Sequence, residues 1–274
     1  MNSIKIAKSS ITGNAKKFIE QKLIDLANKN NIRILLAIES GSRAWGFPSK
    51  NSDYDVRFVY ARSIDDYLLV KPYRDVIETD IEDESFLGVP LDLNGWDIKK
   101  ALYLATKSNA VLIEWLKSPI KYCADTTLVD DVLKLTKDIC DLKIIENHYY
   151  KLATNTWKQI ELSKDKIKFK LYCYALRPTL ALRWIRKYNE APPMDMKSLC
   201  NKLITNNDLY KEIFDLIYLK AAAKESTLTR SNQLIDSFMK STLDKKTEDV
   251  IQIKNEEKIV KANKLFRKII GLSV

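Results

Sequence analysis

The sequence predicts an α+β fold, with a strand-containing domain in residues 1–124 and an all-helical domain in residues 125–274. Two observations predict this division. Runs of apolar and β-branched residues, which are typical of strands, occur only in the first part of the chain. From Asp97 onward, apolar residues recur with the 3.6-residue period of helices, and positive charge begins to accumulate near residue 124.

The predicted elements follow in order along the chain. Residues 14–29 place Phe18, Ile19, Leu23 and Leu26 on one face of an amphipathic helix. Strand candidates then occupy residues 34–38, 54–60, 73–79 and 86–94. Helical periodicity predicts helices near residues 97–107, 109–117, 126–140, 144–163, 166–188, 195–204, 207–225, 229–243 and 248–270.

A motif between residues 34 and 60 organises the chain. Its first strand, residues 34–38, is continuously apolar, which suits a strand buried on both faces. A Gly-Ser turn and a short loop lead to Asp53 and Asp55, which open the second strand. Because successive side chains of a strand point to opposite faces, these two carboxylates point the same way. They repel each other unless a cation lies between them, and such oxygens suit Mg²⁺, which fills its remaining sites with water and substrate phosphates.

The turn before the aspartates has the chemistry of an anion cradle. Gly41 lets the backbone approach a ligand closely, and free amides at the start of a helical turn over Ser42 to Trp45 would hold phosphate. Taken singly, an Asp-x-Asp or a Gly-Ser is more often an ordinary solvated turn. The order of buried strand, Gly-Ser, short loop and Asp-x-Asp is more specific, and it predicts a phosphoryl-transfer site.

These residues resemble the signature of the polymerase-β nucleotidyltransferase superfamily. The strings ESGSRAWGF, SDYDVRFVY, LDLNGWDIKKAL and LIEWLKSPI are similar to one branch of it, the bacterial predicted nucleotidyltransferases related to RNA-repair-associated polymerase-β-like enzymes. The similarity is dense over residues 33–123 and thinner beyond them. Ala110 departs from the family, which usually has proline after Lys-Ser-Asn.

The resemblance implies a polymerase-β-type domain, a small mixed sheet with flanking helices, that transfers a nucleoside monophosphate from an NTP to an acceptor hydroxyl and releases pyrophosphate. It implies two Mg²⁺ ions as cofactors, with Mn²⁺ as an alternative. Asp53 and Asp55 would hold these ions, and Asp92 would complete the catalytic site. The β- and γ-phosphates would be held by Gly41, Ser42 and Arg43.

Two aspartates compete for the role of third carboxylate. Asp92 lies between two leucines in a predicted strand, where a carboxylate without a ligand is costly. The resemblance supplies a reason for it, since the superfamily's third metal carboxylate lies on such a strand. Asp97 precedes a helical pattern and fits a helix N-cap. We therefore favour Asp92 and expect Asp97 to cap.

Other candidates each have an ordinary structural alternative. Arg43 would hold phosphate or make a surface ion pair. Lys100 is assigned to nucleotide binding, because it and Lys107 share a helix face and would steer triphosphate, although such lysines are usually only solvated. His148, the single histidine, matches a His-Tyr pair of the family but would more often be structural.

The net charge of +10 is unevenly distributed. Residues 1–125 hold 18 basic and 17 acidic side chains, whereas residues 126–274 hold 28 and 19. The basic half favours a polyanionic partner, with RNA first (tRNA or a broken RNA end), over the alternative of a lysine-rich solvated surface. The rival functions are a same-fold enzyme that nucleotidylates a protein or small molecule, as a toxin or antibiotic-modifying enzyme, and a non-catalytic RNA-binding module. The intact aspartate set argues against the last.

Composition also bounds the cellular setting. No window is apolar enough for a membrane span, and the first residues lack the apolar core of a signal peptide. The four cysteines are widely spaced and form no Cys-x-x-Cys. We expect a soluble cytoplasmic protein with reduced, buried thiols.

Overall fold

The computed structural model describes residues 11–81, 84–163, 166–222, 227–247 and 256–272. These residues form two compact units. The sheet unit comprises residues 11–41, 53–141 and 256–272, and the helical unit comprises residues 42–52 and 142–247. The units do not follow the predicted boundary, because the sheet unit continues to residue 141 and the helical unit takes up residues 42–52. As a division between catalysis and acceptor binding, the boundary at residue 124 stays a prediction.

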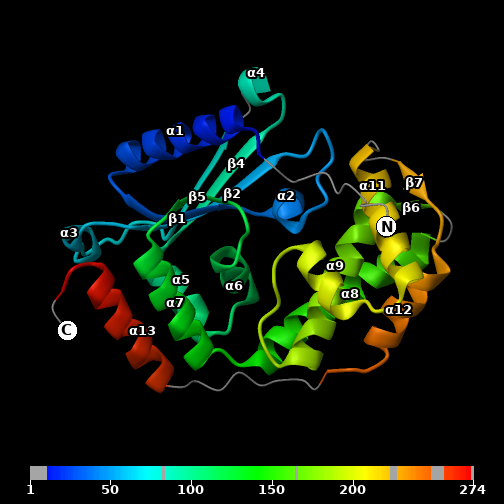
Figure 1. Cartoon of the computed structure of the whole chain (residues 1–274). Helices are drawn as coiled ribbons and strands as arrows, with labels where there is room; N and C mark the ends of the chain where they lie inside the picture. Colours follow the sequence, from blue (N-terminus) through cyan, green and yellow to red (C-terminus); the bar gives the residue numbers. More distant parts are fainter. Residues whose placement is uncertain (1–10, 82–83, 164–165, 223–226, 248–255, 273–274) are drawn as a thin grey trace. The chain divides into compact units, whose positions relative to one another are not determined.

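A five-stranded mixed sheet forms the centre of the sheet unit (Figure 1). The strand order is β3-β4-β2-β1-β5, in which β2 and β4 are parallel and the other neighbours are antiparallel. The strands are β1 (Arg33–Glu39), β2 (Tyr54–Ala61), β3 (Val76–Ile81), β4 (Leu91–Asp97) and β5 (Lys121–Ala124). The fold is therefore the α+β class that the sequence predicts.

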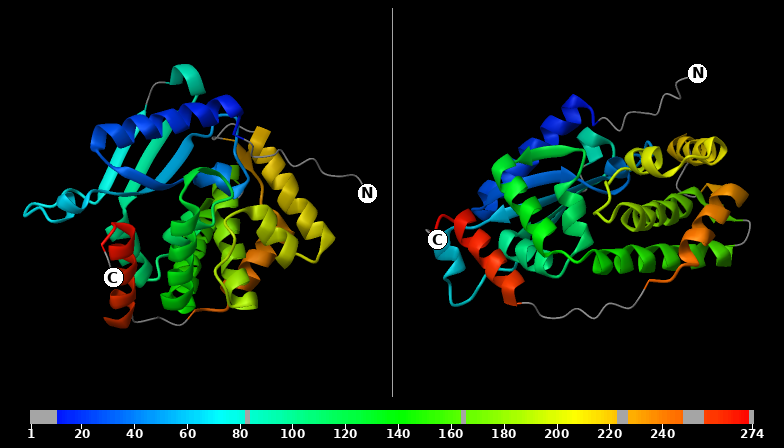
Figure 2. Two further views of the ribbon diagram at one scale, coloured as in Figure 1. Left: turned by 60° about the vertical axis from the view of Figure 1, so that its left-hand side comes forward. Right: turned by 60° about the horizontal axis from the view of Figure 1, so that its bottom comes forward.

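Helices cover both faces of this sheet (Figures 1 and 2). On one face, α1 (Gly13–Asn30) buries its apolar stripe against alternate residues of the strands, and the Thr12 side chain caps its first turn. On the other face, a second core joins the sheet to α5 (Ile98–Thr106) and to α6, α7 and α13. Shorter or later helices of this unit are α3 (Ile64–Tyr67), α4 (Glu84–Leu87), α6 (Ala110–Leu116), α7 (Thr126–Ile139) and α13 (Glu256–Ile269).

The helical unit is built around two long helices that pack against each other, α8 (Leu142–Ser163) and α9 (Phe169–Tyr188). Three further helices, α10 (Met196–Leu203), α11 (Asn207–Ala222) and α12 (Gln233–Leu243), pack on α9. The strands β6 (Ile167–Lys168) and β7 (Leu228–Thr229) pair as a short antiparallel ribbon. Within the stretches that the structure describes, no helix is both long and apolar enough to cross a membrane.

Most of the predicted elements are confirmed, and the errors concern strands. The strand predicted from residue 86 begins at Leu91, because α4 and the positive φ of Gly88 (+69°) precede it. Strands β5, β6 and β7 were not predicted, and residues 248–255 of the helix predicted over 248–270 lie outside the described residues. The thiols of all four cysteines are free, as expected, but only Cys173 and Cys200 are buried, whereas Cys123 is exposed.

Candidate active site

Asp55 and Asp92 lie side by side at the start of the two parallel strands. They are register partners in the pairing of β2 with β4, and neighbouring strands lie about 4.8 Å apart. Tyr54 and Val56 on either side of Asp55 belong to the core beneath α1, so the carboxylate of Asp55 points to the opposite face. Leu91 and Leu93, on either side of Asp92, also belong to that core, so the carboxylate of Asp92 points to the same face as that of Asp55. Parallel pairing therefore brings two carboxylates together.

Arg57 lies between these two carboxylates. Its Nη2 atom is 2.7 Å from Oδ2 of Asp92 and 3.4 Å from Oδ1 of Asp55. Arg57 follows Asp55 by two residues on the same strand, so both side chains share one face. The guanidinium relieves the repulsion between Asp55 and Asp92, whereas the cation expected from the sequence was placed between Asp53 and Asp55. Sequence reasoning missed Arg57, although its spacing from Asp55 was a usable signal.

Gly41 allows the backbone to pass directly against Asp55. A Cβ atom at this position would lie 1.9 Å from Oδ2 of Asp55, far inside any possible contact, and the φ angle of Gly41 is +59°. The amide of Ser40 also donates to the carbonyl oxygen of Asp55, at 2.7 Å. Glycine is therefore required here because the neighbouring carboxylate, and not only a ligand, needs the space.

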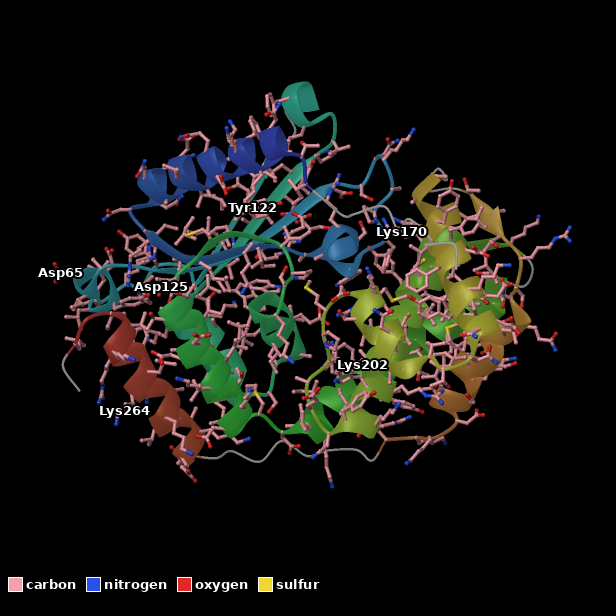
Figure 3. The ribbon with its side chains drawn as sticks, in the orientation of Figure 1. Asp65, Tyr122, Asp125, Lys170, Lys202 and Lys264 are labelled. Carbon is pink, nitrogen blue, oxygen red and sulfur yellow. The ribbon has the colours of Figure 1, made fainter. Side chains whose placement is uncertain are left out.

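The buried carboxylate of Glu39 binds the backbone of Asp55. Glu39, with no exposed surface, accepts hydrogen bonds from the amide of Asp55 (3.0 Å) and from the hydroxyl of Tyr122 (2.5 Å). Tyr122, labelled in Figure 3, belongs to the core that α1 covers. The Ser118 hydroxyl donates to the carbonyl oxygen of Glu39, at 2.7 Å. Glu39 thus fixes the start of β2 through the amide of Asp55. In the sequence, this role is indicated by the position of Glu39 at the end of the buried first strand.

Two of the residues predicted to hold phosphate, Ser42 and Arg43, lie in the loop Ser42–Ser52, which belongs to the helical unit and which we call the phosphate loop after that prediction. Gly41 precedes this loop and belongs to the sheet unit. Ser42 is buried, and its hydroxyl contacts that of Ser52 at 3.2 Å. Nη2 of Arg43, the first residue after Ser42, donates to the carbonyl oxygen of Ser52 at 2.5 Å, which closes the loop. The described contact of Arg43 is therefore to the loop backbone. Helix α2 (Gly41–Trp45) confirms the helical turn predicted there.

Asp97 and Lys100 lie at the far end of the same strands. Asp97 is the last residue of β4, five residues beyond Asp92, which corresponds to about 16 Å along a strand. It caps α5 by accepting from the Lys99 amide at 2.8 Å, as predicted. The ammonium group of Lys100 contacts Asp75 at 3.0 Å, and Asp75 in turn accepts from the Asp97 amide through its carbonyl oxygen. The structure does not bring Lys100 to the paired carboxylates.

The two aspartates should therefore respond differently to substitution. Asp97→Ala should lower the free energy of unfolding by about 0.5–2 kcal/mol, the usual cost of a lost cap. Asp97→Asn should recover most of it, because asparagine caps equally well. Urea unfolding of the three proteins measures this. Nucleotide transfer should persist in both variants, and its loss in Asp97→Asn would mean that Asp97, and not Asp92, is the third carboxylate.

Burial also shifts the pKa of Asp97. Its side chain is 4% exposed, and this burial raises the pKa of the carboxyl above its ordinary value. The Lys99 amide and the Tyr67 hydroxyl, which both donate to Asp97, oppose the rise. A carboxyl held in this way is suited to a structural role at a helix start.

The residues fit a magnesium ion in part. Asp55 and Asp92 offer hard oxygen atoms on one face, which is what Mg²⁺ binds together with water and phosphate. Asp53 is exposed, one residue before β2 begins. Among the described residues, no group of three or more Asp, Glu, His or Cys side chains lies close enough to hold a metal ion. Asp55 and Asp92 therefore form a pair of carboxylates in the described part of the chain, and the site of three carboxylates stays a prediction.

His148 is exposed on α8, in the helical unit, and its ring stands edge-on to Tyr149 at 5.3 Å between centroids. That position is compatible with the structural role that the sequence favours for a single histidine on a helix.

One family model and two known proteins are similar to this chain. A model of the RNA repair pathway DNA polymerase beta family matches residues 15–268. An uncharacterized protein, YcgL, of Bacillus subtilis (strain 168) is 36% identical over 244 residues, which cover 88% of this chain and 91% of that protein. A crystal structure of a nucleotidyltransferase-like protein from Exiguobacterium sibiricum matches with 9% identity and a TM-score of 0.33, over 92% of this chain and 79% of that one. The chain belongs to the RNA repair pathway DNA polymerase beta family.

Proposed function

We propose that this protein is a metal-dependent nucleotidyltransferase that transfers a nucleoside monophosphate from an NTP to a hydroxyl group of RNA. The observation that carries the proposal is the pairing of Asp55 with Asp92 beside Gly41, on adjacent parallel strands. Membership of a polymerase-β family supports the same chemistry. In the reaction, the acceptor oxygen forms a bond to the α-phosphorus, the bond between the α- and β-phosphates breaks, and pyrophosphate leaves.

Each site residue has a defined part in this chemistry. Mg²⁺, when bound, neutralises phosphate charge and lowers the pKa of the attacking hydroxyl. Asp55 and Asp92 would hold it, with Asp53 adjacent in the chain. Positioning and charge neutralisation supply most of the acceleration in phosphoryl transfer, and the proton that the acceptor hydroxyl loses would pass to water.

Arg57 and a metal ion would use the same oxygen atoms. The guanidinium now contacts one oxygen of each carboxylate, which keeps the two side chains aligned on one face. We expect it to turn away from them when a metal ion binds, because two cations cannot share these positions.

The phosphate loop is continuous in the chain with both parts of the carboxylate site. One peptide bond joins Gly41 to Ser42, and another joins Ser52 to Asp53. In the proposed function, Ser42 and Arg43 hold the β- and γ-phosphates, as the family resemblance implies. Lys100 is left out of this site, because its described partner is Asp75.

RNA is the acceptor that the charge distribution favours. The excess of 28 basic over 19 acidic side chains in residues 126–274 provides a positive field, and the family description names an RNA repair pathway. Incubating the protein with each of the four α-labelled NTPs and with total RNA, total protein or aminoglycosides identifies the acceptor. Label on RNA supports the proposal. Label on protein or drug would favour the toxin or antibiotic-modifying alternative, and no label with retained RNA binding would favour a non-catalytic module.

Binding of RNA through charge should depend steeply on salt. Each phosphate neutralised releases condensed counterion, so the logarithm of affinity should fall with the logarithm of salt by about 0.7 per contact for single strands. Reversing Lys166 and Lys168, both exposed, to glutamate should weaken binding and flatten the slope. The matched control reverses Lys17 and Lys29, exposed on α1 in the nearly neutral half. Filter binding at several salt concentrations measures both. Equal losses from the two pairs would show that net charge alone, and not the basic half, attracts RNA.

A further inference from the structure

We propose that Lys220 and Arg177 are positioning residues that hold the phosphate loop in the shape needed to bind triphosphate. Both lie in the helical unit, far from the motif in sequence. The inference rests on the proposed function, in which Ser42 and Arg43 of this loop contact the phosphates. It adds two residues that the motif does not contain.

The phosphate loop is packed into the helical unit. Ala44 and Phe47 are 1% and 0% exposed, so the loop has a buried side of its own. The ring of Trp45 stands edge-on to Tyr174 of α9, with 5.2 Å between centroids, and the ring of Phe47 lies 6.1 Å from the same tyrosine. The loop is therefore held by residues of a distant helix and does not depend on its own sequence alone.

Lys220 holds the far end of the first turn of this loop. Its ammonium group is buried and donates to the carbonyl oxygen of Phe47 at 2.7 Å, and it lies 5.6 Å from the centroid of that ring. At the near end, the amides of Gly46 and Phe47 donate to the carbonyl oxygen of Ser42, at 3.1 and 3.0 Å. A single short turn therefore connects the lysine contact to Ser42. If the carbonyl of Phe47 moved, the turn that presents Ser42 would move with it.

Arg177 supports the same turn from a second side. Its side chain is 3% exposed, and the guanidinium carbon lies 5.0 Å from the ring centroid of Trp45 and 5.8 Å from that of Tyr149 on α8. Its Nε atom donates to the carbonyl oxygen of Met194 at 3.2 Å. The guanidinium is thus fixed by the helical unit and stacks against the loop through Trp45.

Two buried cations beneath one loop indicate more than packing. An apolar side chain of similar size would fill the same space without the cost of removing a charge from water. A charge in the poorly polarisable interior acts on its surroundings more strongly than one in water. Lys220 and Arg177 instead hold the loop by a hydrogen bond to its backbone and by stacking on Trp45. Lys170, at the start of α9 (Figure 3), lies 5.9 Å from the ring of Tyr174, which contacts the same loop.

The test measures binding of inorganic triphosphate with Mg²⁺ to the full chain by calorimetry. This probe has no base, so the unknown NTP preference does not enter. Lys220→Met should weaken binding by about tenfold or more, the effect of losing a hydrogen bond to a charged group. Lys211→Met is the matched control, because Lys211 is an exposed lysine on the same helix, α11. It should change binding less than twofold, and Lys220→Arg should restore much of the loss.

Two further measurements separate positioning from a general structural effect. Thermal unfolding shows which variants are folded, and Mn²⁺ binding followed by electron paramagnetic resonance reports on the carboxylate pair. In the folded Lys220→Met protein, Mn²⁺ binding should be unchanged while triphosphate binding falls. If Lys220→Met does not fold, Lys220→Gln and Arg177→Met carry the same expectation.

The outcomes distinguish this inference from the proposed function. If the unaltered protein binds triphosphate and the folded variants of Lys220 and Arg177 bind it equally well, the positioning role is wrong and the nucleotidyltransferase proposal stands. If the unaltered protein binds neither triphosphate nor any of the four NTPs, the proposed function is wrong and the positioning role falls with it.

Discussion

Asp55→Asn should abolish nucleotide transfer and leave the protein folded. Asparagine has nearly the same shape but lacks the negative charge that would hold a metal ion against the phosphates. Losing several kcal/mol of charge stabilisation in the transition state corresponds to a rate decrease of about a thousandfold or more. Stability should change by only about 1 kcal/mol or less, because Arg57 keeps its contact with Asp92 (2.7 Å) at a partly exposed site.

The measurement is the initial rate of NTP transfer at saturating Mg²⁺, together with urea unfolding. Asp65→Asn serves as the control, since Asp65 is an exposed aspartate of the sheet unit, on α3 (Figure 3). It should leave the rate unchanged. Full activity in Asp55→Asn would contradict the assignment of this carboxylate to the metal site.

Gly41→Ala should have a comparably large effect, by displacing the carboxylate instead of neutralising it. The new methyl group would lie 1.9 Å from Oδ2 and 2.8 Å from Cγ of Asp55, so the side chain of Asp55 must move. The positive φ of +59° adds a backbone cost of about 1–2 kcal/mol for any residue other than glycine. Transfer and Mn²⁺ binding should both be lost.

A second glycine separates these two effects. Gly88 has a φ of +69°, but a Cβ atom there would meet nothing within 4 Å. Gly88→Ala should therefore lower the free energy of unfolding by about the same 1–2 kcal/mol. Nucleotide transfer and Mn²⁺ binding should both be kept. If Gly41→Ala retained Mn²⁺ binding at the level of Gly88→Ala, the close approach of Gly41 to Asp55 would have no functional importance.

The parts of the fold that local patterns specify could be predicted from the sequence. The amphipathic stripe of α1 and the apolar run of β1 are strong periodic signals, and both elements form where expected. Strand β5 carries no such signal, because its burial alternates weakly and Lys121 and Cys123 are exposed. It is a strand because β1 offers a free edge for pairing, which is a tertiary effect.

In the candidate site, too, some contacts follow from local sequence patterns and others depend on tertiary structure. Of the two candidate aspartates, Asp92 lies opposite Asp55 in the parallel pairing and Asp97 does not, and the role of Asp92 as third carboxylate stays a prediction. Arg57 follows Asp55 by two residues, so the alternation of side chains along a strand could have predicted that it shares a face with Asp55. Lys220 and Phe47 are 173 positions apart in the chain, and no local sequence pattern predicts the hydrogen bond between them.

The central claim is tested most directly by mass spectrometry of a defined RNA oligonucleotide with a 3′-hydroxyl end. The oligonucleotide is incubated with the protein, Mg²⁺ and each NTP in turn, while pyrophosphate is measured in the same reaction. We expect the RNA to gain the mass of a nucleoside monophosphate, with release of one pyrophosphate per addition. With Asp55→Asn we expect no gain in RNA mass and no pyrophosphate. RNA of unchanged mass with all four NTPs, together with nucleotide found on a protein or small molecule, would contradict the central claim.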